Sequence, residues 1–327
     1  MNPTSEMSQV LRMTHGRLQS SDSAARPIYP MTADSVRRVG VVGAGQMGTG
    51  IAQTAAQAGY DVSLSDVNLE RAQSAKQGLE KRLARAVERG KLTADEAEGI
   101  VQRIEVRAPS QHQDADLVVE AAVEDLEAKL RIFAGLGQLV QEHCLLASNT
   151  SSISITRLAA NVPHPDRFIG LHFMNPVPIM KLVEIIVGLQ TSLETRQLAQ
   201  SFAESLDKTV IHSQDRPGFI VNRILIPLLN EACFAVQEHV ASVNDIDQGA
   251  RLGLNHPMGP LELADLIGLD TVLAIAEVLH REFSDSKYRP APLLKNLVAA
   301  GHHGRKSGRG FYVYGADGRI THAATLE

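Results

Sequence analysis

The stretch that decides the fold is Val36-Arg-Arg-Val-Gly-Val-Val-Gly-Ala-Gly-Gln-Met-Gly48. Its first part, residues 36–42, is a short apolar run, which is typical of a strand buried on both faces of a sheet. Glycines then follow in a G-x-G-x-x-G spacing, and an Ala- and Gln-rich pattern over residues 47–58 predicts a helix that closes at Gly59. A strand, a glycine turn and a helix in this order predict the first unit of a parallel α/β sheet that binds a dinucleotide.

Each glycine of this turn has a separate task in such a unit. Gly43 permits the tight turn, Gly45 lets the backbone approach a pyrophosphate, and Gly48 lets the helix pack closely on the strand. The phosphate charge would then face the helix N-terminus beside Gln46 and Met47. A glycine-rich turn that binds no ligand is the alternative interpretation.

The second strand, predicted for residues 61–66, ends in Asp66. An acid at this position, about 20 residues after the glycines, can accept hydrogen bonds from the ribose hydroxyls and repels a 2′-phosphate. We therefore expect NAD as the cofactor rather than NADP, although a solvated acid without a ligand would give the same sequence. FAD shares the glycine fingerprint but suits a chain with a small helical second domain less well.

Composition and charge limit the function classes. The 327-residue chain is 44% hydrophobic and 21% charged, which is typical of a globular protein and not of a collagen-like, disordered or membrane-spanning chain. Its net charge of −5 argues against a nucleic-acid partner, which normally requires a basic surface. Neither Cys144 nor Cys233 has a C-x-x-C partner, so we expect two reduced thiols in the core, and we expect no metal site.

The pattern of strands and helices divides the chain into three parts. Short strands and helices alternate from residue 36 to 213, as expected for a Rossmann-type NAD-binding domain. After Pro217-Gly218 only helical patterns follow, so residues 214–327 are expected to form an all-α C-terminal domain. Further strands are predicted at residues 104–106, 117–120, 145–147, 168–173, 181–187 and 209–211. Helices are predicted at residues 68–89, 126–142, 219–237, 244–253, 261–267 and 270–283, with one more that ends at Gly301.

Residues 1–35 differ from the rest of the chain. They are rich in Ser and Thr and lack an apolar period, so a disordered extension is expected. They contain no hydrophobic segment of a secretory signal, and the acids and prolines among their arginines make an organelle-targeting leader the less favoured alternative. We therefore expect a cytoplasmic protein.

Three polar clusters interrupt otherwise apolar segments. Ser148-Asn-Thr-Ser-Ser152 follows a strand and therefore lies at its carboxyl end, the edge at which open α/β sheets bind ligands. His172 lies at the end of the strand over 168–173, and Glu184 interrupts an apolar run, where a buried carboxylate needs a partner. The turn Asn175-Pro-Val-Pro178 joins these two strands and would set Glu184 beside His172.

A histidine oriented by a carboxylate can act as a general base. Taken singly, His172 could be a hydrogen-bonded core histidine, Glu184 a structural carboxylate and residues 148–152 a helix cap. Together with the dinucleotide motif they predict a dehydrogenase, in which His172 moves a hydroxyl proton while hydride passes to nicotinamide.

Seven strings over residues 37–314 also carry a family resemblance. They are VGVVGAGQMGTGIA, DLVVEAAVED, ASNTSS, DRFIGLHFMNPVPIMKLVEII, DRPGFIVNRIL, LGLNHPMGPLELADLIGLD and GRKSGRGFYVY. Through them the chain resembles the L-3-hydroxyacyl-CoA dehydrogenases of the short, monofunctional type, which include bacterial 3-hydroxybutyryl-CoA dehydrogenases. The resemblance implies an NAD domain, a helical C-terminal domain that forms a dimer interface, and oxidation of (S)-3-hydroxyacyl-CoA to 3-ketoacyl-CoA.

The resemblance also implies roles for individual residues. His172 matches the family's catalytic base and Glu184 its carboxylate partner. Ser151 matches a serine that contacts the substrate hydroxyl and the cofactor, and Asn222 matches an asparagine that helps to polarise the substrate carbonyl.

Further ligand contacts are implied in the same way. Those to NAD are Glu124, Lys129, Asn175 and Lys306. Those to CoA are Ser151 and Lys129. CoA phosphates are also expected along the helix after Asp66, where relatives often carry Ser and Lys and this chain departs from them with Arg82 and Arg89. Arginine can bind a phosphate as well as lysine does. An ordinary surface pair is the alternative for Glu124 and Lys129, and a solvated charged face is the alternative for the two arginines.

Two other function classes remain as alternatives. The same fold could serve a dehydrogenase of a 3-hydroxy acid without CoA or of a carnitine-type substrate. It could also persist as a crystallin-like structural or NAD-binding protein. The intact set of His172, Glu184, Ser151 and Asn222 argues against the structural alternative, because a structural protein has no physical need for buried polar side chains in this arrangement.

Overall fold

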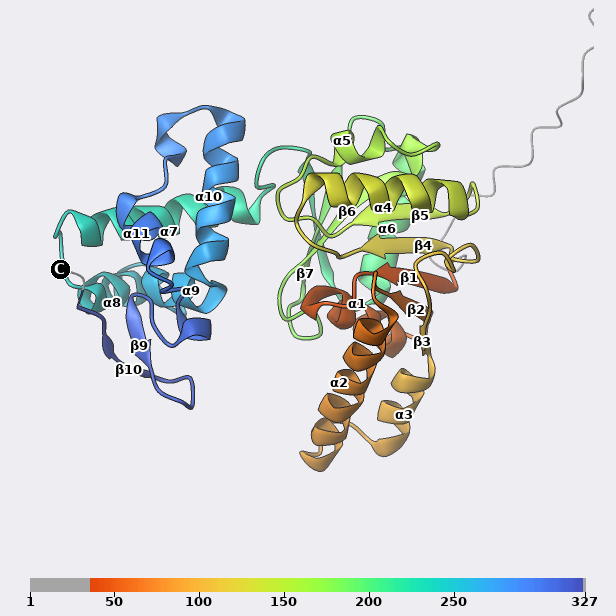
Figure 1. The fold of residues 1–327 in the computed structure, drawn as a ribbon, viewed down its shortest axis with the longest axis horizontal. Helices are drawn as coiled ribbons and strands as arrows, with labels where there is room; N and C mark the ends of the chain where they lie inside the picture. Colours follow the sequence, from red (N-terminus) through yellow and green to blue (C-terminus); the bar gives the residue numbers. More distant parts are fainter. Residues whose placement is uncertain (1–35, 326–327) are drawn as a thin grey trace, which may run out of the picture. The chain divides into compact units, whose positions relative to one another are not determined.

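The computed structural model describes residues 36–325, and Figure 1 shows its fold. Eight strands form one sheet in the order β3-β2-β1-β4-β5-β6-β7-β8, and all neighbours are parallel except β6 and β7. The strand order reverses between β1 and β4, and at such a point open α/β sheets bind ligands beyond the carboxyl ends of their strands. The strands are β1 Arg38–Val42, β2 Asp61–Ser65, β3 Ile104–Val106, β4 Leu117–Glu120, β5 Leu145–Ser148, β6 Phe168–Phe173, β7 Leu182–Val187 and β8 Thr209–Gln214.

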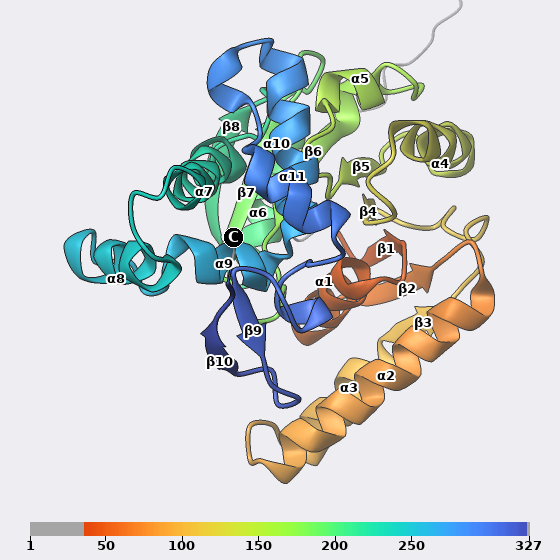
Figure 2. The ribbon, with the colours of Figure 1, turned by 60° about the vertical axis from the view of Figure 1, so that its left-hand side comes forward.

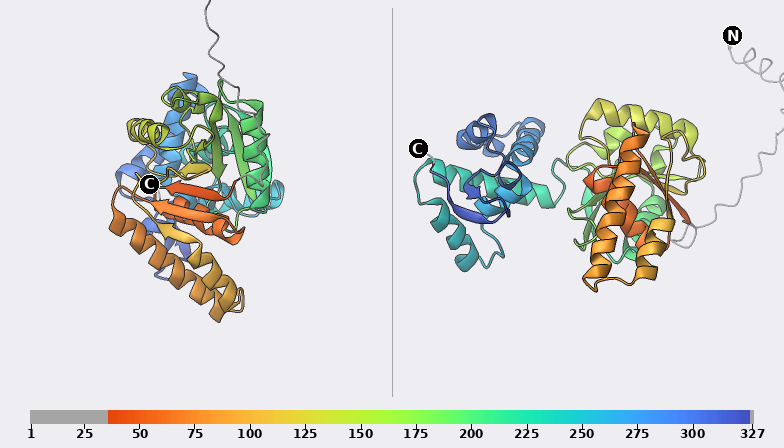
Figure 3. Two further views of the ribbon diagram at one scale, coloured as in Figure 1. Left: turned by 90° about the vertical axis from the view of Figure 1, so that its right-hand side faces the viewer. Right: turned by 60° about the horizontal axis from the view of Figure 1, so that its bottom comes forward.

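Helices cover both faces of this sheet (Figure 3, left). Those on one face are α1 Gln46–Gln57, α2 Leu69–Glu88 and α6 Leu193–Ser205, and those on the other are α4 Leu126–Leu139 and α5 Ile155–Ala159. Val41 and Leu64 contribute to the first core, and Val118 and Leu146 contribute to the second. Because strands buried on both faces are apolar along their whole length, the sequence pattern could identify them.

The α2 helix and α3 (Ala94–Gln102) lie side by side next to the edge of the sheet that ends in β3 (Figure 2). The α3 helix was not predicted, and neither were α5 and α6. The sequence does carry a signal for α3, because Thr93 and Glu96 form a reciprocal capping box at its start.

The last third of the described chain is mainly helical, as predicted. Its helices are α7 Val221–Gln237, α8 Val243–Gly253, α9 Pro260–Ile267, α10 Leu269–Phe283 and α11 Pro292–Ala299. They have a core of their own that includes Leu229, Leu261 and Phe311. The expectation of helices alone missed an antiparallel pair of strands, β9 Tyr312–Tyr314 and β10 Ile320–Ala323. Strands this short, three and four residues long, show no alternation that a sequence pattern could reveal.

A Rossmann-type α/β sheet followed by a helical region confirms the predicted fold class. The extension predicted for residues 1–35 lies outside the described residues. Among residues 36–325, no helix combines the length and the apolar character that crossing a membrane requires.

Cys144 and Cys233 are free and buried, and burial raises the pKa of the Cys144 thiol to about 12 and that of Cys233 well above its usual range. Both thiols therefore stay protonated in the core.

Candidate active site

The glycine turn between β1 and α1 has the geometry that its sequence predicts. Gly43 has φ +108°, and a Cβ there would lie 2.5 Å from the carbonyl oxygen of Ala121. A Cβ at Gly48 would lie 1.8 Å from the carbonyl oxygen of Gly43, so α1 approaches β1 this closely only with glycine. At Gly45 no atom of the described residues beyond its immediate neighbours along the chain lies within 4 Å of where a Cβ would be. The turn is therefore tight on the protein side and open where a ligand would approach.

A cavity of about 750 Å³ opens beside this turn. Its size lies in the usual range of cofactor sites, and apolar side chains from α4 form part of its wall. The predicted cofactor residues that line it are Gly43, Gly45, Gln46, Met47 and Asp66. An open glycine turn, an apolar wall and a carboxylate at the strand end together fit a dinucleotide.

Asp66 is held in place against the glycine turn and is not a solvated acid. The residue is 7% exposed, and its Oδ2 accepts a hydrogen bond of 2.9 Å from the backbone N–H of Ala44. The nearest cation is Arg71 on α2, whose Nε lies 3.7 Å from the same oxygen. The carboxylate is thus fixed in direction before any ligand binds.

A buried histidine that the sequence analysis missed supports the same strand. The His112 ring lies between two hydroxyls of β2, with Nδ1 2.8 Å from Ser63 Oγ and Nε2 2.8 Å from Ser65 Oγ. Burial, and to a lesser extent Arg107, lowers the pKa of His112 to about 4, so the ring is neutral near neutral pH. Because this histidine and its serines lie far apart in sequence, no local pattern could reveal the contact.

The structure brings His172, Glu184 and Ser151 together. β6 and β7 pair with His172 directly opposite Glu184, and the Nδ1 of His172 lies 2.7 Å from the Oε2 of Glu184. On the other side of the ring, Nε2 lies 3.0 Å from Ser151 Oγ. His172 is 5% exposed and Glu184 is fully buried. If Glu184 is ionised, its carboxylate can only accept hydrogen bonds, so Nδ1 of His172 would be the donor to it. In the neutral ring Nε2 would then be the acceptor that faces Ser151.

The second oxygen of Glu184 is held by the chain that leads into α7. Oε1 accepts hydrogen bonds of 3.0 Å from the backbone N–H groups of both Ile220 and Val221. Asn222 follows, and its amide nitrogen lies 3.5 Å from the carbonyl oxygen of Ser151. Both carboxylate oxygens of Glu184 are therefore satisfied, which makes burial of the charge tolerable.

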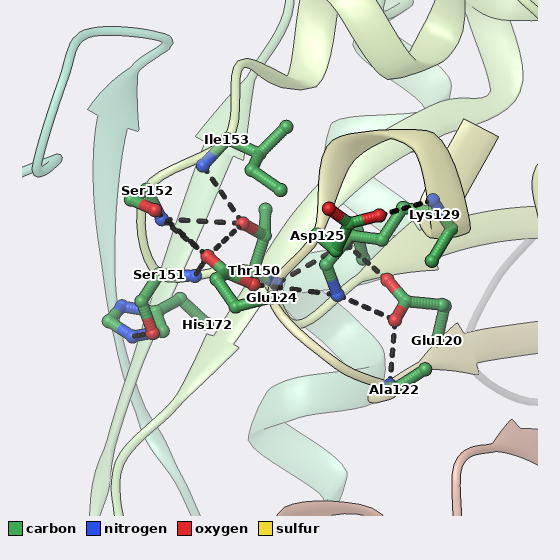
Figure 4. Close-up of polar contacts among 12 residues, drawn as sticks. Glu120, Ala122, Glu124, Asp125, Lys129, Thr150, Ser151, Ser152, Ile153 and His172 are labelled. Atoms are coloured by element: carbon green, nitrogen blue, oxygen red, sulfur yellow. Dashed lines mark hydrogen bonds and ion pairs between the residues drawn. The ribbon is translucent and has the colours of Figure 1, made fainter. Parts of the chain in front are cut away.

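Glu124 organises the loop that carries Ser151 (Figure 4). One of its carboxylate oxygens accepts hydrogen bonds from the Thr150 hydroxyl at 2.6 Å and from the backbone N–H groups of Ser151 and Ser152 at 2.9 and 3.0 Å. Asn149 adds a second anchor, because its Oδ1 accepts the N–H of Phe173 on β6. These contacts fix the loop beside His172.

Lys129 is not on the helix surface. Its side chain is 1% exposed, and its ammonium lies 2.6 Å from the fully buried Glu120 and 3.5 Å from Glu124 (Figure 4). Glu120 also accepts hydrogen bonds from Ser148 Oγ and from the N–H of Ala122. The sequence analysis missed Glu120, although a glutamate at the end of the apolar strand Leu-Val-Val-Glu carries the same signal as Glu184. The contacts that Lys129 makes are those of a buried ion pair, so its roles toward NAD and CoA stay predictions.

The remaining predicted residues lie in different settings. Asn175 Oδ1 accepts a hydrogen bond of 2.9 Å from Gln46 Nε2, which joins two expected cofactor contacts. Lys306 pairs with Asp270 at 2.6 Å within the helical region. Arg82 lies on α2 and Arg89 directly follows it, and both are exposed. Within residues 36–325, no group of three His, Cys, Asp or Glu side chains is placed to hold a metal ion.

Comparisons with known proteins agree with this geometry. The family model described as "3-hydroxyacyl-CoA dehydrogenase, NAD binding domain" matches residues 38–216, and the model of the C-terminal domain of the same family matches residues 218–314. The chain is 51% identical over 280 residues to a probable 3-hydroxybutyryl-CoA dehydrogenase of Bacillus subtilis, covering 85% of this chain and 98% of the relative. A protein of Deinococcus radiodurans with the same description is 54% identical over 278 residues, covering 85% of this chain and all of the relative.

Solved structures show the same relationship. The crystal structure of (S)-3-hydroxybutyryl-CoA dehydrogenase from Ralstonia eutropha matches with a TM-score of 0.83 at 48% identity, covering 86% of this chain and 100% of that one. The sequence, the sheet order and these relatives agree. The chain therefore belongs to the 3-hydroxyacyl-CoA dehydrogenase family of NAD-dependent oxidoreductases and carries that family's NAD-binding domain.

Proposed function

We propose that this chain oxidises short-chain (S)-3-hydroxyacyl-CoA, such as 3-hydroxybutyryl-CoA, to 3-ketoacyl-CoA. The observation that carries the proposal is the line Ser151–His172–Glu184, with spacings of 3.0 and 2.7 Å, at the edge of a dinucleotide-binding sheet. Relatives about half identical to the chain are described as 3-hydroxybutyryl-CoA dehydrogenases, which supports the acyl-CoA substrate.

His172 is the general base of this proposal. Its Nε2 lone pair takes the proton of the substrate hydroxyl, and Glu184 holds Nδ1–H and stabilises the imidazolium that forms. Ser151 Oγ, which lies against Nε2, orients the substrate hydroxyl. The Asn222 amide donates to the substrate carbonyl, since it lies next to the Ser151 backbone.

The cofactor completes the balance of the reaction. NAD, when bound, supplies the acceptor for the hydride that leaves the substrate carbon. Gly43, Gly45 and Gly48 would shape its phosphate site, with Asp66 at the ribose. Glu124, Lys129, Asn175 and Lys306 are proposed as further contacts, Glu124 through the loop that it holds.

The CoA contacts, the assembly and the location belong to the same proposal. Arg82 and Arg89, seven residues apart near one face of α2, are proposed to bind CoA phosphates.

We also propose that the protein is a homodimer with domains over residues 36–213 and 214–327. We propose that it is cytoplasmic, and the bacterial relatives support this cellular location. Light scattering on the purified protein tests the dimer, and a monomer at micromolar concentration would contradict it.

A substrate comparison tests the proposed reaction. We expect acetoacetyl-CoA to drive oxidation of NADH, and 3-hydroxybutyryl-CoA to be oxidised with a higher kcat/KM than free 3-hydroxybutyrate or carnitine. Preference for a free acid would contradict the thioester assignment. No turnover with any of these substrates, at intact dinucleotide binding, would favour a non-enzymatic role.

A further inference from the structure

The chain that leads into α7 places an aromatic ring against the imidazole of His172. The ring centroids of Phe219 and His172 lie 5.7 Å apart at an interplanar angle of 62°, the edge-to-face arrangement that aromatic pairs favour. Phe219 is 5% exposed and packs with Ile155 and Ile186 in the core on the α4 and α5 face of the sheet. The proposed base therefore has a firmly packed neighbour in addition to its two polar partners.

The backbone of Phe219 is strained. Its φ is +51°, in the left-handed region where a bulky side chain is uncommon, and Gly218 before it has φ +78°. Strain of this kind persists only where the surrounding structure over-determines it, and it gathers at sites with a function. The strain therefore indicates a requirement at this turn beyond filling the core.

The same turn delivers N–H groups to Glu184. Ile220 and Val221 come directly after it, and each donates its backbone N–H to Oε1 over 3.0 Å. Val221 begins α7, and the Ile220 side chain provides no cap for this helix. The buried carboxylate thus takes the place of a helix cap, and the left-handed turn directs the helix N-terminus at it.

Phe219 therefore reaches both members of the proposed proton-transfer pair, Glu184 through the backbone that follows it and His172 through its ring. Hydrogen bonds at Nδ1 and Nε2 fix two points on the rim of the imidazole, but they leave its tilt to the groups that pack against it. A base that tilts loses its alignment with the substrate proton, and a misplacement of about 1 Å can cost about a hundredfold in rate.

We propose that Phe219 is a positioning residue for the base: its ring fixes the tilt of the His172 imidazole, and its left-handed turn holds Glu184. The inference rests on the proposed function, in which His172 takes the substrate proton. A core side chain without influence on the base is the alternative, and it predicts a loss of stability alone.

A double-mutant cycle of wild type, Phe219→Leu, His172→Gln and the double variant separates these two roles. Leucine keeps an apolar side chain in the core and removes the ring. The rate of NADH formation from 3-hydroxybutyryl-CoA in a single turnover isolates the chemical step, and KM, the Kd of NADH and the thermal unfolding midpoint are measured alongside. The matched control is Phe133→Leu, because Phe133 lies in the same core and makes an edge-to-face contact with Phe168, with centroids 4.6 Å apart.

We expect Phe219→Leu to slow the single turnover by about tenfold, with KM and the Kd of NADH within about twofold of the wild type. In the His172→Gln background the same substitution should change the rate by less than about twofold, because a residue that acts through the base then has nothing left to position. Phe133→Leu should lower the midpoint as Phe219→Leu does, and it should keep the single-turnover rate within about twofold.

The inference is wrong if Phe219→Leu keeps its rate within about twofold, if its loss persists in full on top of His172→Gln, or if Phe133→Leu loses rate equally. If Phe219→Leu does not fold, Phe219→Met takes its place in the cycle, since an unbranched, flexible side chain fills an irregular gap. A His172→Gln protein that turns over within about tenfold of the wild type would instead remove the base itself, which distinguishes failure of the proposed function from failure of this inference.

Discussion

Two regions of the molecule bury carboxylates in apolar surroundings, and they use them differently. The first is the relay cluster of Ser151, His172 and Glu184. The second is the aspartate–tyrosine cluster of the helical region, which consists of Asp247, Asp265, Tyr312 and Tyr314. Glu184, Asp247 and Asp265 are all fully buried. Burial of an acid therefore does not by itself mark a catalytic site.

The partners make the difference. Asp265 accepts the N–H groups of Phe311 and Tyr312 and the hydroxyl of Tyr314. Asp247 accepts two N–H groups at the start of α9 and the hydroxyl of Tyr312 at 2.8 Å. Burial raises the pKa of both tyrosines well above the usual range, so these partners do not exchange protons near neutral pH.

In Glu184 only one carboxylate oxygen accepts backbone N–H groups in the same manner. The other faces an imidazole, the side chain that titrates nearest to neutral pH, and the far nitrogen of that ring reaches Ser151. The aspartate–tyrosine cluster ties β9 to α8 and α9, whereas the relay cluster can pass a proton on. This contrast predicts that variants of one cluster lose rate and variants of the other lose stability.

The largest effect is expected for His172→Gln. Without the base, kcat for 3-hydroxybutyryl-CoA should fall by about a hundredfold to ten-thousandfold. The Kd of NADH should stay within about twofold, because no part of the ring lines the dinucleotide cavity. Steady-state kinetics and fluorescence titration measure the two quantities. Equal losses in kcat and in the affinity for NADH would point to a disrupted fold.

The next largest effect concerns Asp265. Burial raises its pKa in the folded state to about 6, from an ordinary value of 3.8. The folded state therefore binds this proton more tightly, so the free energy of unfolding should fall as pH rises from about 4 to about 6 and then level off, by at most about 3 kcal/mol. Urea titrations across this range should show the slope in the wild type and in Asp317→Asn, an exposed control. A slope that persists in Asp265→Asn would assign it to another group.

A smaller effect is expected for Glu184→Gln. Loss of one charge-assisted hydrogen bond should lower kcat/KM by about tenfold to a hundredfold, less than His172→Gln. The pH–rate profile should also shift, because Glu184 no longer stabilises the imidazolium that forms when His172 accepts the substrate proton. A profile that stays in place would contradict the pairing.

The smallest effect is expected on the exposed face of α2. Arg82→Ser and Arg89→Ser should each raise KM for acyl-CoA about two- to fivefold, and added salt should shrink the difference, since both arginines are exposed. Lys81→Ser on the same helix is the control and should leave KM unchanged. Equal shifts in all three variants would remove the specific phosphate contact.

The pairing of His172 with Glu184 was predictable because its information is local, whereas the place of Ser151 beside them followed only from the family resemblance. The turn at residues 175–178 fixes an antiparallel pair, and an acid in one apolar strand then needs a partner in the other. His172 and Glu184 indeed lie directly opposite each other. The glycine turn was predictable for the same reason, since a strand, a turn and a helix follow without interruption.

The buried pair of Glu120 and Lys129 shows what was overlooked. Lys129 lies between Leu126 and Phe133 at helical spacing, on the face of α4 that packs against the sheet. A lysine at such a position on an apolar stripe indicates a buried side chain that needs a carboxylate partner. The family resemblance implied contacts of Lys129 to NAD and CoA instead. The aspartate–tyrosine cluster gave no such signal in the sequence. The groups near β9 that contact Asp265 and Asp247 lie 46 to 65 residues along the chain from these aspartates.

One measurement tests the central contrast most directly: kcat and the thermal unfolding midpoint of His172→Gln and Tyr312→Phe, taken side by side. The relay variant should lose at least about a hundredfold in kcat with little change in midpoint. Tyr312→Phe, which deprives Asp247 of its hydroxyl donor, should lose about 1–2 kcal/mol of stability and keep its kcat per folded molecule. A His172→Gln protein that turns over within about tenfold of the wild type would contradict the account, because it would remove the proton transfer on which it rests.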